Sequence, residues 1–503
     1  MQSDLKQEPS PSDPNDRPAP GPDRVVYAAY AGTLILLLAR LPILARRFFD
    51  PDELQHTHDA WCAFKGMLPY RDFFEHHTPW YYYLLRPFFH AFSVDTSFES
   101  ARHFLIFGRV LSLLLTAIAV ALLVRLGRLA GNRRVGALAG LLFVGMPIAT
   151  QKTLEIRPDA LALPFTIGGF VLLLAGLANG VGGTTKQRWY FLGGGLGLGA
   201  AIMCTQKILF VLPGTAVGMG LWLLFAKQPA TLYRRFLRSL PLLAGLLLPL
   251  AATLAAFATQ HAAWLMFEHN FLLNAQWKVR VGEQLLRTLE MTWPALLLCL
   301  VGATVTIYRH VRQKQALHGE ILLLTTLLGL IAGILIIPVA HRQYYLILLP
   351  FTAVFAAKGL LFLVELARPR ARPWILVFAT LALNILTVAD LLDAYHSPND
   401  EQLARLRQVF ARTKPTDLVM DGWKGTGVFR PHAFHYAFIH EELVPMIPPD
   451  TVRAFLADLE AGKVRPQLIA LDENLILTFG SPLVRFVFKH YETSDGLLYF
   501  AKH

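Results

Sequence analysis

The stretch FLIFGRVLSLLLTAIAVALLVRLGRLA, residues 104–130, decides the fold class of this chain. It is longer than the roughly 20 apolar residues that an α-helix needs to cross a bilayer. The apolar stretch 189–226 is about twice one span, and Gln206 and Lys207 divide it into two helices. Further apolar stretches lie at 25–46, 134–150, 159–178, 237–259, 289–308, 320–339, 343–365 and 373–394. The sequence therefore predicts an α-helical polytopic membrane protein with about 11 transmembrane helices.

The composition agrees with a membrane protein, since 54% of the residues are hydrophobic and only 16% are charged. The net charge of +12 comes from short Lys and Arg clusters between apolar stretches, not from one basic face. This pattern argues against a nucleic-acid partner and for contact with membrane lipids. Three cysteines are too few for a disulfide framework, and we read them as small core residues.

The basic loops set the expected orientation, because Lys and Arg accumulate in cytoplasmic loops. Loops 125–134, 179–188, 226–238, 309–318 and 366–373 are basic and are expected to be cytoplasmic. This places the N-terminus inside, and loops 47–102, 151–158 and 260–288 outside. Arg46 and Arg47 lie at the outer end of the first span against this rule, and we expect them to serve a site there.

The chain divides into three expected parts. Residues 1–24 are rich in Pro and Asp and are expected to form a disordered cytoplasmic tail. Residues 25–395 are expected to form the membrane module, and residues 396–503 a small soluble domain at the outer face. Short β-like runs, Leu418 to Met420 and Leu468 to Leu471, flank a helix-like stretch from Thr451 to Ala461, which predicts an α/β fold for this domain.

The first outer loop contains the most unusual chemistry, FFDPDELQHTHDAWCAFKGMLPYRDFFEHHTPWYYYLL from Phe48. Charged groups beside a membrane are costly in free energy unless they are paired, hydrated or part of a functional site. The simpler alternative to a functional site is a solvated loop whose charges only face water. Aromatic residues interleave the charges and would dock the loop at the membrane interface. Asp52 and Glu53 offer two adjacent carboxylates, and one with a pKa raised by desolvation would suit a general base. We therefore expect loop 47–102 to be catalytic.

A second acidic cluster, TLEIRPDAL from Thr153, is expected on the same side of the membrane. It contains Glu155, Arg157 and Asp159 at the start of another span. Pro158 and Asp159 would also suit the first turn of a helix, so capping and function are both open.

The four histidines of the first loop raise the question of a metal, because imidazole and carboxylate groups bind zinc and other divalent ions. Their spacing matches no firm metal motif, so no cofactor is certain and a divalent metal is possible. The residues concerned are His56, His58, His76 and His77.

Cations on the same expected face would suit a phosphate group, which Arg binds through two hydrogen bonds at once. For each cation alone, an interfacial position with the charged end reaching water is the simpler explanation. The candidates are Arg46, Arg47, Lys152, Arg157, Lys207, Lys278, Arg280 and Arg342, with His341, Tyr344 and Tyr345 adjacent.

Four segments resemble the membrane glycosyltransferases of the GT-C type, specifically the protein-mannosyltransferase and aminoarabinose-transferase-like group (glycosyltransferase family 39-like). They are DPDELQHTHDAW with GMLPYRDFFEHHTPWYYYLL, LEIRPDAL, CTQKILFVLP, and HRQYYLILLPFTAVFAA from His341. Together they cover about residues 25–395, the extent of a polytopic module. The chain departs from the aminoarabinose transferases at His76 and His77, where a lysine often follows the glutamate. This departure leaves the donor sugar open.

The resemblance implies a GT-C-like fold and an inverting transfer of a hexosyl or pentosyl group from a polyprenyl-phosphate carrier. The acceptor, a lipid, a glycan or a protein, would be glycosylated at the outer face of the bacterial inner membrane, so the C-terminal domain would be periplasmic or extracellular. Asp52 would be the catalytic aspartate with Glu53 beside it, Glu75 would help to form the pocket, and Asp159 or Glu155 would be the second acidic position. The carrier phosphate would meet Lys207, His341, Arg342, Arg157 and Tyr345. A polytopic transporter or flippase of a lipid-linked or small substrate is the main alternative, since acidic groups near helix ends also suit coupled transport.

Overall fold

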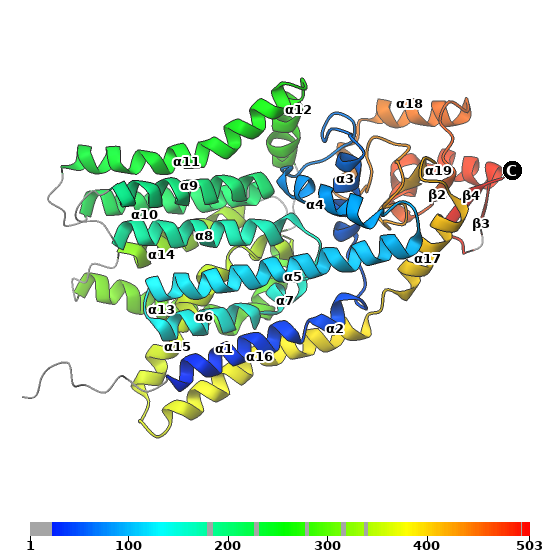
Figure 1. Ribbon diagram of the computed structural model, residues 1–503. Coiled ribbons are helices and arrows are strands. Elements are labelled where there is room, and N and C mark those ends of the chain that lie inside the picture. The colour runs from blue at the N-terminus through cyan, green and yellow to red at the C-terminus, as the bar shows by residue number, and fades with distance from the viewer. Residues whose placement is uncertain are drawn as a thin grey trace, which may run out of the picture.

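The computed structural model describes residues 23–178, 185–225, 231–276, 281–312, 318–336, 341–493 and 495–502. Long helices lie side by side in one bundle, and a small domain with strands lies at one end of it beside α3 and α4 (Figure 1). Residues 1–22 of the expected disordered tail, parts of three basic loops, and Lys278 and Arg280 lie outside the described residues. The expectations for them stay predictions.

Nine helices among the described residues are long and apolar enough to cross a membrane. Each of the eleven predicted spans is helical, and the two not among the nine form α6 and α9, which pack within the bundle. The polytopic helical fold is therefore confirmed, and the chain is an integral, multi-pass membrane protein. The helices of these spans are α1 Arg24–Leu38 with α2 Leu41–Leu44, α5 Phe98–Leu129, α6 Arg133–Val144 with α7 Pro147–Lys152, α8 Pro158–Ala178, α9 Thr185–Cys204, η1 Gln206–Phe210 with α10 Val211–Phe225, α11 Leu232–Ala258, α13 Val281–Arg312, α14 His318–Ile336, α15 Leu349–Leu366 and α16 Arg372–His396.

The surface of the bundle is apolar, as contact with lipid requires. Helix α16 exposes Trp374, Phe378, Leu381 and Ile385, which recur every three or four residues and form one stripe along the helix. Inside the bundle, small residues bring helices together. A side chain at Gly195 of α9 would overlap the backbone of α11, so glycine permits this close approach.

Loop 47–102, which is expected at the outer face, is largely helical. It contains α3, Pro51–Phe64, and α4, Trp80–Phe92. Asp50 caps α3 by accepting from Asp52 N at 3.1 Å, and Glu53 Oε1 accepts from Asp50 N at 3.1 Å. This reciprocal capping box, with Pro51 at the first helical position, fixes the start of α3. The sequence signal for it, Asp-Pro-Asp-Glu, is present at residues 50–53, although we read it only as chemistry.

The C-terminal segment forms a four-stranded sheet with helices around it, so the predicted α/β character is confirmed. The strand order is β1-β2-β4-β3, with β1 parallel to β2 and the other two pairs antiparallel. The predicted strands and helix correspond to β1, β2 and α18. The elements are α17 Asp400–Arg412, β1 Val419–Asp421, η5 Val444–Met446, α18 Pro449–Glu460, β2 Leu468–Ala470, α19 Glu473–His490, β3 Tyr491–Thr493 and β4 Leu498–Ala501.

Loop 47–102 and the C-terminal domain share one hydrophobic core. Phe49, Trp61 and Phe104 cluster with Phe429 and Phe438, and all five are buried. Phe48 N also donates to Ser397 O at 2.7 Å. This shared core fixes the C-terminal domain against α3. The short elements α12 Ala263–Phe267, η2 Glu268–Leu273, η3 Asn274–Gln276 and η4 Arg342–Tyr345 lie between the spans.

Candidate functional site

A polar cavity of about 390 Å³, here called the central cavity, lies where the start of α3 meets the bundle and the C-terminal domain. Segments more than 400 residues apart in sequence line it, so tertiary structure assembles it. Its lining residues are Asp50, Asp52, Gln55, His76, His77, Lys152, Arg157, Lys207, His341, Gln343, Tyr344, Trp423, His440, Glu441, Glu442 and Asn474.

Asp52 lies in the first turn of α3, and its carboxylate faces this cavity. Arg157 Nη1 donates to Asp52 Oδ2 over 2.6 Å, while the Asp52 side chain stays 22% exposed. Burial raises the pKa of Asp52, but the positive charges of Arg157 and Lys152 lower it more, so the pKa lies below its usual range. Asp52 is therefore a fixed anion beside a fixed cation.

The expectation of a raised pKa is wrong for Asp52, because sequence spacing did not reveal the cations that fold against it. The raised pKa belongs to Asp59, about two helical turns further along α3. Burial is the main cause, and the negative charge of the neighbouring Glu75 adds to it. Asp59 therefore holds the proton of a buried carboxyl pair that does not line the central cavity.

Glu155 is buried beneath the cavity and connects three cations, so it organises the site instead of facing it. Its oxygens accept from Arg47 at 2.9 Å, Lys152 at 3.0 Å and Arg157 at 3.1 Å. Its side chain is fully buried. Arg47 therefore has a partner at this site, which explains its position against the charge rule. Arg46 instead lies over the ring of Tyr395 at 4.6 Å.

Asp159 follows Pro158 at the start of α8, as expected, and faces Lys207 across the cavity wall. Lys207 lies in η1, the predicted break between two spans, and its Nζ is 3.4 Å from Asp159 Oδ1 and 4.6 Å from the centre of the Tyr344 ring. Tyr344 lines the cavity, whereas Tyr345 is buried behind it. Arg342 also lies behind the lining, where Nη1 approaches Gln151 Oε1 at 3.4 Å.

The cluster around the cavity alternates charge, with four carboxylates facing four cations in direct ion pairs. A phosphate that enters must compete with these carboxylates for the cations, and well-placed cations in a buried site stabilise phosphate charge strongly. The groups are Asp50, Asp52, Glu155 and Asp159 with Arg47, Lys152, Arg157 and Lys207.

Glu53 does not line the central cavity. It is fully buried and forms two hydrogen bonds with Arg109, from Nη2 to Oε1 at 2.7 Å and from Nε to Oε2 at 2.9 Å. Ile156 N also donates to Oε2 at 3.2 Å. Glu53 therefore holds α3 and the acidic cluster together, and the structure does not bring it to the central cavity with Asp52.

Glu75 is buried behind His77, as a pocket-forming residue would be. Its Oε1 accepts from His76 N at 2.8 Å, His77 N at 2.6 Å and His77 Nδ1 at 2.7 Å. Burial opposes ionisation, but contacts with Asp59 and His77 outweigh it and lower the pKa of Glu75. Glu75 thus orients the imidazole of His77 at the cavity wall.

Glu75, His76 and His77 also form a candidate metal group, with one ligand atom from each lying within 4.8 Å of the others. One carboxylate and two imidazoles suit zinc chemically. Glu75 Oε1 already accepts three hydrogen bonds, whereas Oε2 is buried and accepts none of them, so Oε2 is the oxygen that a metal would use. His56 contacts Tyr82 instead, with Nδ1 3.2 Å from the hydroxyl, and His58 lies away from this group against Val428 O at 3.0 Å.

No sequence pattern pointed to the part of the cavity wall that the C-terminal domain supplies. The residues missed are Trp423, His440, Glu441, Glu442 and Asn474. Glu442 Oε1 is 3.4 Å from His341 Nε2 on the membrane module, and Oε2 is 3.1 Å from His440 Nδ1. Hydrogen bonds from His341 and His440 lower the pKa of Glu442 below its usual range. This contact closes the cavity between the two parts of the chain.

Residues 76–258 match the family model described as dolichyl-phosphate-mannose-protein mannosyltransferase. This match and the structural likenesses below confirm the resemblance inferred from the four sequence segments. None of the curated proteins matches the sequence of this chain.

Two solved enzymes resemble the fold along most of its length. ArnT from Cupriavidus metallidurans in the apo state is 12% identical, with a TM-score of 0.66, over 95% of this chain and 97% of that chain. Its structure bound to undecaprenyl phosphate is 11% identical, with a TM-score of 0.60 and the same coverage. The Archaeoglobus fulgidus oligosaccharyltransferase is 12% identical, with a TM-score of 0.60, over 95% of this chain and 74% of that chain. At this identity the likeness establishes the fold, which is that of the GT-C glycosyltransferases.

Proposed function

Because the chain has the GT-C glycosyltransferase fold, we propose that it transfers a sugar from a polyprenyl-phosphate carrier to an acceptor of the cell envelope. One observation carries this proposal: the carboxylate of Asp52 and the cations Lys152, Arg157 and Lys207 converge on one cavity at the end of a membrane bundle. A carboxylate suits the activation of an acceptor hydroxyl, and cations suit a departing phosphate. The solved structures support a polyprenyl-phosphate carrier. ArnT binds undecaprenyl phosphate, and AglB, the oligosaccharyltransferase of Archaeoglobus fulgidus, binds a dolichol-phosphate.

In the proposed reaction, Asp52 accepts a hydrogen bond from the acceptor hydroxyl and takes its proton as the oxygen attacks the anomeric carbon. The bond from that carbon to the carrier phosphate breaks, and the phosphate leaves with the electron pair. A single displacement of this kind inverts the anomeric configuration. The lowered pKa of Asp52 keeps it ionised before the reaction, so it accepts the proton only as the hydroxyl becomes acidic in the transition state.

Lys207 is the cation we assign first to the carrier phosphate. Its contact with Asp159 is long, 3.4 Å, so little hydrogen bonding is lost when it turns to a phosphate oxygen. Arg157 and His341 complete the phosphate site, and Tyr344 takes the place expected of Tyr345 because it is the tyrosine that lines the cavity. Arg342 lies behind this lining and would act through Gln151.

Glu53, Glu155 and Glu75 have positioning roles in this proposal. Glu53 holds the start of α3, Glu155 holds the cations, and Glu75 orients His77. Asp159 is the second acidic group of the site and sets the position of Lys207. We place the reaction at the outer face of the bacterial inner membrane, with the N-terminus cytoplasmic, on the charge pattern of the loops. The transferred sugar is a hexosyl or pentosyl group, and the acceptor a lipid, a glycan or a protein.

The test compares Asp52→Asn with Asp72→Asn in a strain that lacks the protein. Asp72 belongs to the same outer loop but pairs with Arg71 at 2.7 Å and does not line the cavity. Mass spectrometry of envelope glycans and lipids reports the missing sugar. We expect Asp72→Asn to restore it, and Asp52→Asn to restore less than about one hundredth of it, the usual scale for loss of acid–base catalysis.

Binding of undecaprenyl phosphate by the purified Asp52→Asn protein shows that the variant is folded. Restoration of the sugar by this folded variant would refute the role of Asp52. An unchanged envelope in the strain that lacks the protein would refute glycosyl transfer itself.

A further inference from the structure

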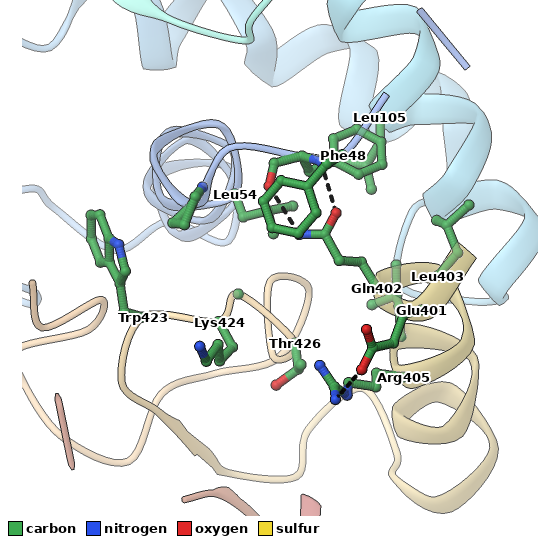
Figure 2. Close-up of a pocket in the computed structure, with 14 residues that line it drawn as sticks. Phe48, Leu54, Leu105, Glu401, Gln402, Leu403, Arg405, Trp423, Lys424 and Thr426 are labelled. Carbon is green, nitrogen blue, oxygen red and sulfur yellow. Dashed lines mark hydrogen bonds and ion pairs between the residues drawn. The ribbon is translucent and has the colours of Figure 1, made fainter. Parts of the chain in front are cut away.

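A second cavity, of about 270 Å³, lies beside the central cavity and shares one lining residue with it, Trp423. Segment 48–55 forms the wall between the two. Asp50, Asp52 and Gln55 line the central cavity, whereas Phe48, Phe49, Pro51 and Leu54 line the second one. Helix α17 and Leu105 of α5 complete the second cavity (Figure 2). It therefore lies directly behind the turn that carries Asp52.

The loop that places Trp423 is held by two buried aspartates. Asp472 Oδ2 accepts from Trp423 N at 2.5 Å, and Asp421 accepts from Lys424 N at 3.0 Å and from Thr426 N at 2.5 Å. The indole ring packs on His440, with ring centres 5.3 Å apart. Because the Trp423 side chain is already held in place, it loses little conformational entropy when a ligand binds against it.

Backbone groups along this cavity are already used, which determines how a ligand can be recognised. The N–H groups of Gly425 and Gly427 also donate to Asp421, at 3.2 Å each. Gln402 uses both ends of its amide on Phe49, accepting from N at 2.7 Å and donating to O at 2.9 Å (Figure 2). The N–H groups of residues 423–427 all donate to Asp421 or Asp472, so an extended peptide finds no free N–H group in this loop. Recognition must come from side chains.

The side chains around the second cavity suit one sugar ring. Trp423, Pro51 and Leu54 offer apolar surfaces, and Lys424 and the ion pair between Glu401 and Arg405 offer charged groups around them (Figure 2). A pyranose has an apolar C–H face and a rim of hydroxyl groups, which matches this arrangement. The volume lies just below the roughly 300–1,000 Å³ of pockets for drug-sized ligands, so it fits one ring and not a long segment.

We propose that the second cavity is an acceptor subsite that binds one pyranose ring of a carbohydrate acceptor, stacked on Trp423 at the edge of the central cavity. This inference rests on the proposed function and narrows its acceptor to a glycan or the sugar headgroup of a glycolipid. Lys424, which is exposed, contributes a donor at the mouth of the cavity.

The test blocks the second cavity without touching the central one. The three native cysteines, Cys62, Cys204 and Cys299, are buried, so an introduced cysteine can be labelled alone. Lys424→Cys in the full chain is labelled with a bulky benzophenone maleimide, and Lys463→Cys, on the exposed surface after α18, carries the same label as the control. Saturation-transfer NMR measures binding of methyl glycosides of glucose, galactose, mannose and N-acetylglucosamine. Binding of undecaprenyl phosphate serves as the check on fold and donor site.

We expect at least one methyl glycoside to bind the unlabelled chain, and the label at Lys424→Cys to weaken that binding by about tenfold or more. The label at Lys463→Cys should leave it unchanged, and both labelled proteins should bind undecaprenyl phosphate normally. A dodecyl glycoside that binds much more tightly than its methyl counterpart would assign the ring to a glycolipid, and equal binding would assign it to a glycan.

Several outcomes would overturn the inference. They are no binding of any methyl glycoside, equal binding after labelling at Lys424→Cys, and loss of undecaprenyl phosphate binding from that label. A failure of the proposed function is distinct, because it would show as an unchanged envelope in the strain that lacks the protein. Glycoside binding with such an unaffected envelope would refute the acceptor role.

Discussion

Arg109 and Glu53 form a buried, two-pronged ion pair directly beneath the first turn of α3, with contacts of 2.7 and 2.9 Å. The guanidinium also donates to the carbonyl oxygens of Leu44, Arg47 and Phe48, at 2.7 to 3.0 Å. One side chain of α5 therefore connects the end of the first span to the helix that carries Asp52. The adjacent acidic residues 52 and 53 thus have different tasks: Asp52 faces the cavity, and Glu53 anchors the turn.

Glu53→Gln should destabilise the protein. It leaves the buried guanidinium of Arg109 without its countercharge, and breaking a buried ion pair typically costs about 3–5 kcal/mol. Thermal unfolding in nanodiscs measures the effect. Glu99→Gln is the control, because Glu99 forms exposed ion pairs whose loss costs little. A Glu53→Gln protein as stable as the control would contradict the anchoring role.

Lys207→Met should weaken binding of undecaprenyl phosphate by about tenfold or more, because one charge-assisted hydrogen bond is worth roughly 1.5–3 kcal/mol. Lys207→Arg should retain much of the binding, since the charge remains. Isothermal titration in nanodiscs gives the dissociation constants. Lys186→Met, an exposed change at the start of α9, provides the control. Equal affinity of the Lys207→Met and Lys186→Met proteins would remove Lys207 from the phosphate site.

Gly425→Ala should reduce both stability and activity, because Gly425 has φ +72° and a Cβ there would overlap the Leu54 side chain of α3. Gly496→Ala carries the same backbone penalty, at φ +73°, but a Cβ there meets nothing within 4 Å. The difference between the two variants isolates the contact of the C-terminal domain with α3. We expect Gly425→Ala to be the less stable by about 1–3 kcal/mol, the usual cost of overpacking. Equal stability and equal restoration of the envelope sugar would show that this contact is unimportant.

Acid should destabilise the contact between α3 and the C-terminal domain through His58 and His432, whose ring centres lie 5.9 Å apart. Burial lowers the pKa of His58 to about 3 and that of His432 to about 4, from 6.5. The contribution of the two neutral histidines to the free energy of unfolding is complete above pH 6.5. It falls as the pH decreases from 6.5 toward their folded pKa values, because the unfolded chain binds protons at a higher pH than the folded chain does. The slope is at most about 1.4 kcal/mol per pH unit for each histidine.

Asp472 acts in the opposite direction, since burial and the charge of Asp421 raise its pKa to about 6. The contribution of protonated Asp472 to the free energy of unfolding is complete below pH 3.8, the pKa in the unfolded chain, and is lost as the pH rises through 6. Melting temperatures between pH 7.5 and 4.5 for the natural chain and for His432→Gln separate these effects. We expect the variant to lose less stability on acidification, and His490→Gln, an exposed change in the same domain, to behave like the natural chain. The same slope for His432→Gln would exclude His432 as a cause.

The membrane architecture could be predicted from the order of the residues, because crossing a bilayer requires long apolar helices and these are visible residue by residue. The break at Gln206 and Lys207 and the strands near residues 419 and 468 were predictable in this local way, whereas only the family resemblance distinguished Asp52 from Glu53. A family resemblance carried by short segments added the GT-C fold.

The pairing of charged side chains, in contrast, depends on how the chain folds. No local pattern shows that Arg157 pairs with Asp52, or that Arg109 binds Glu53 outside the cavity. Nor does it show that Trp423 lines the same cavity as Asp52, from which it is separated by more than 350 residues in sequence. The direction of the pKa shift at Asp52 depends on its contacts with Arg157 and Lys152, because desolvation raises the pKa and neighbouring cations lower it. Burial alone predicts a raised pKa, and the cations brought by folding reverse it.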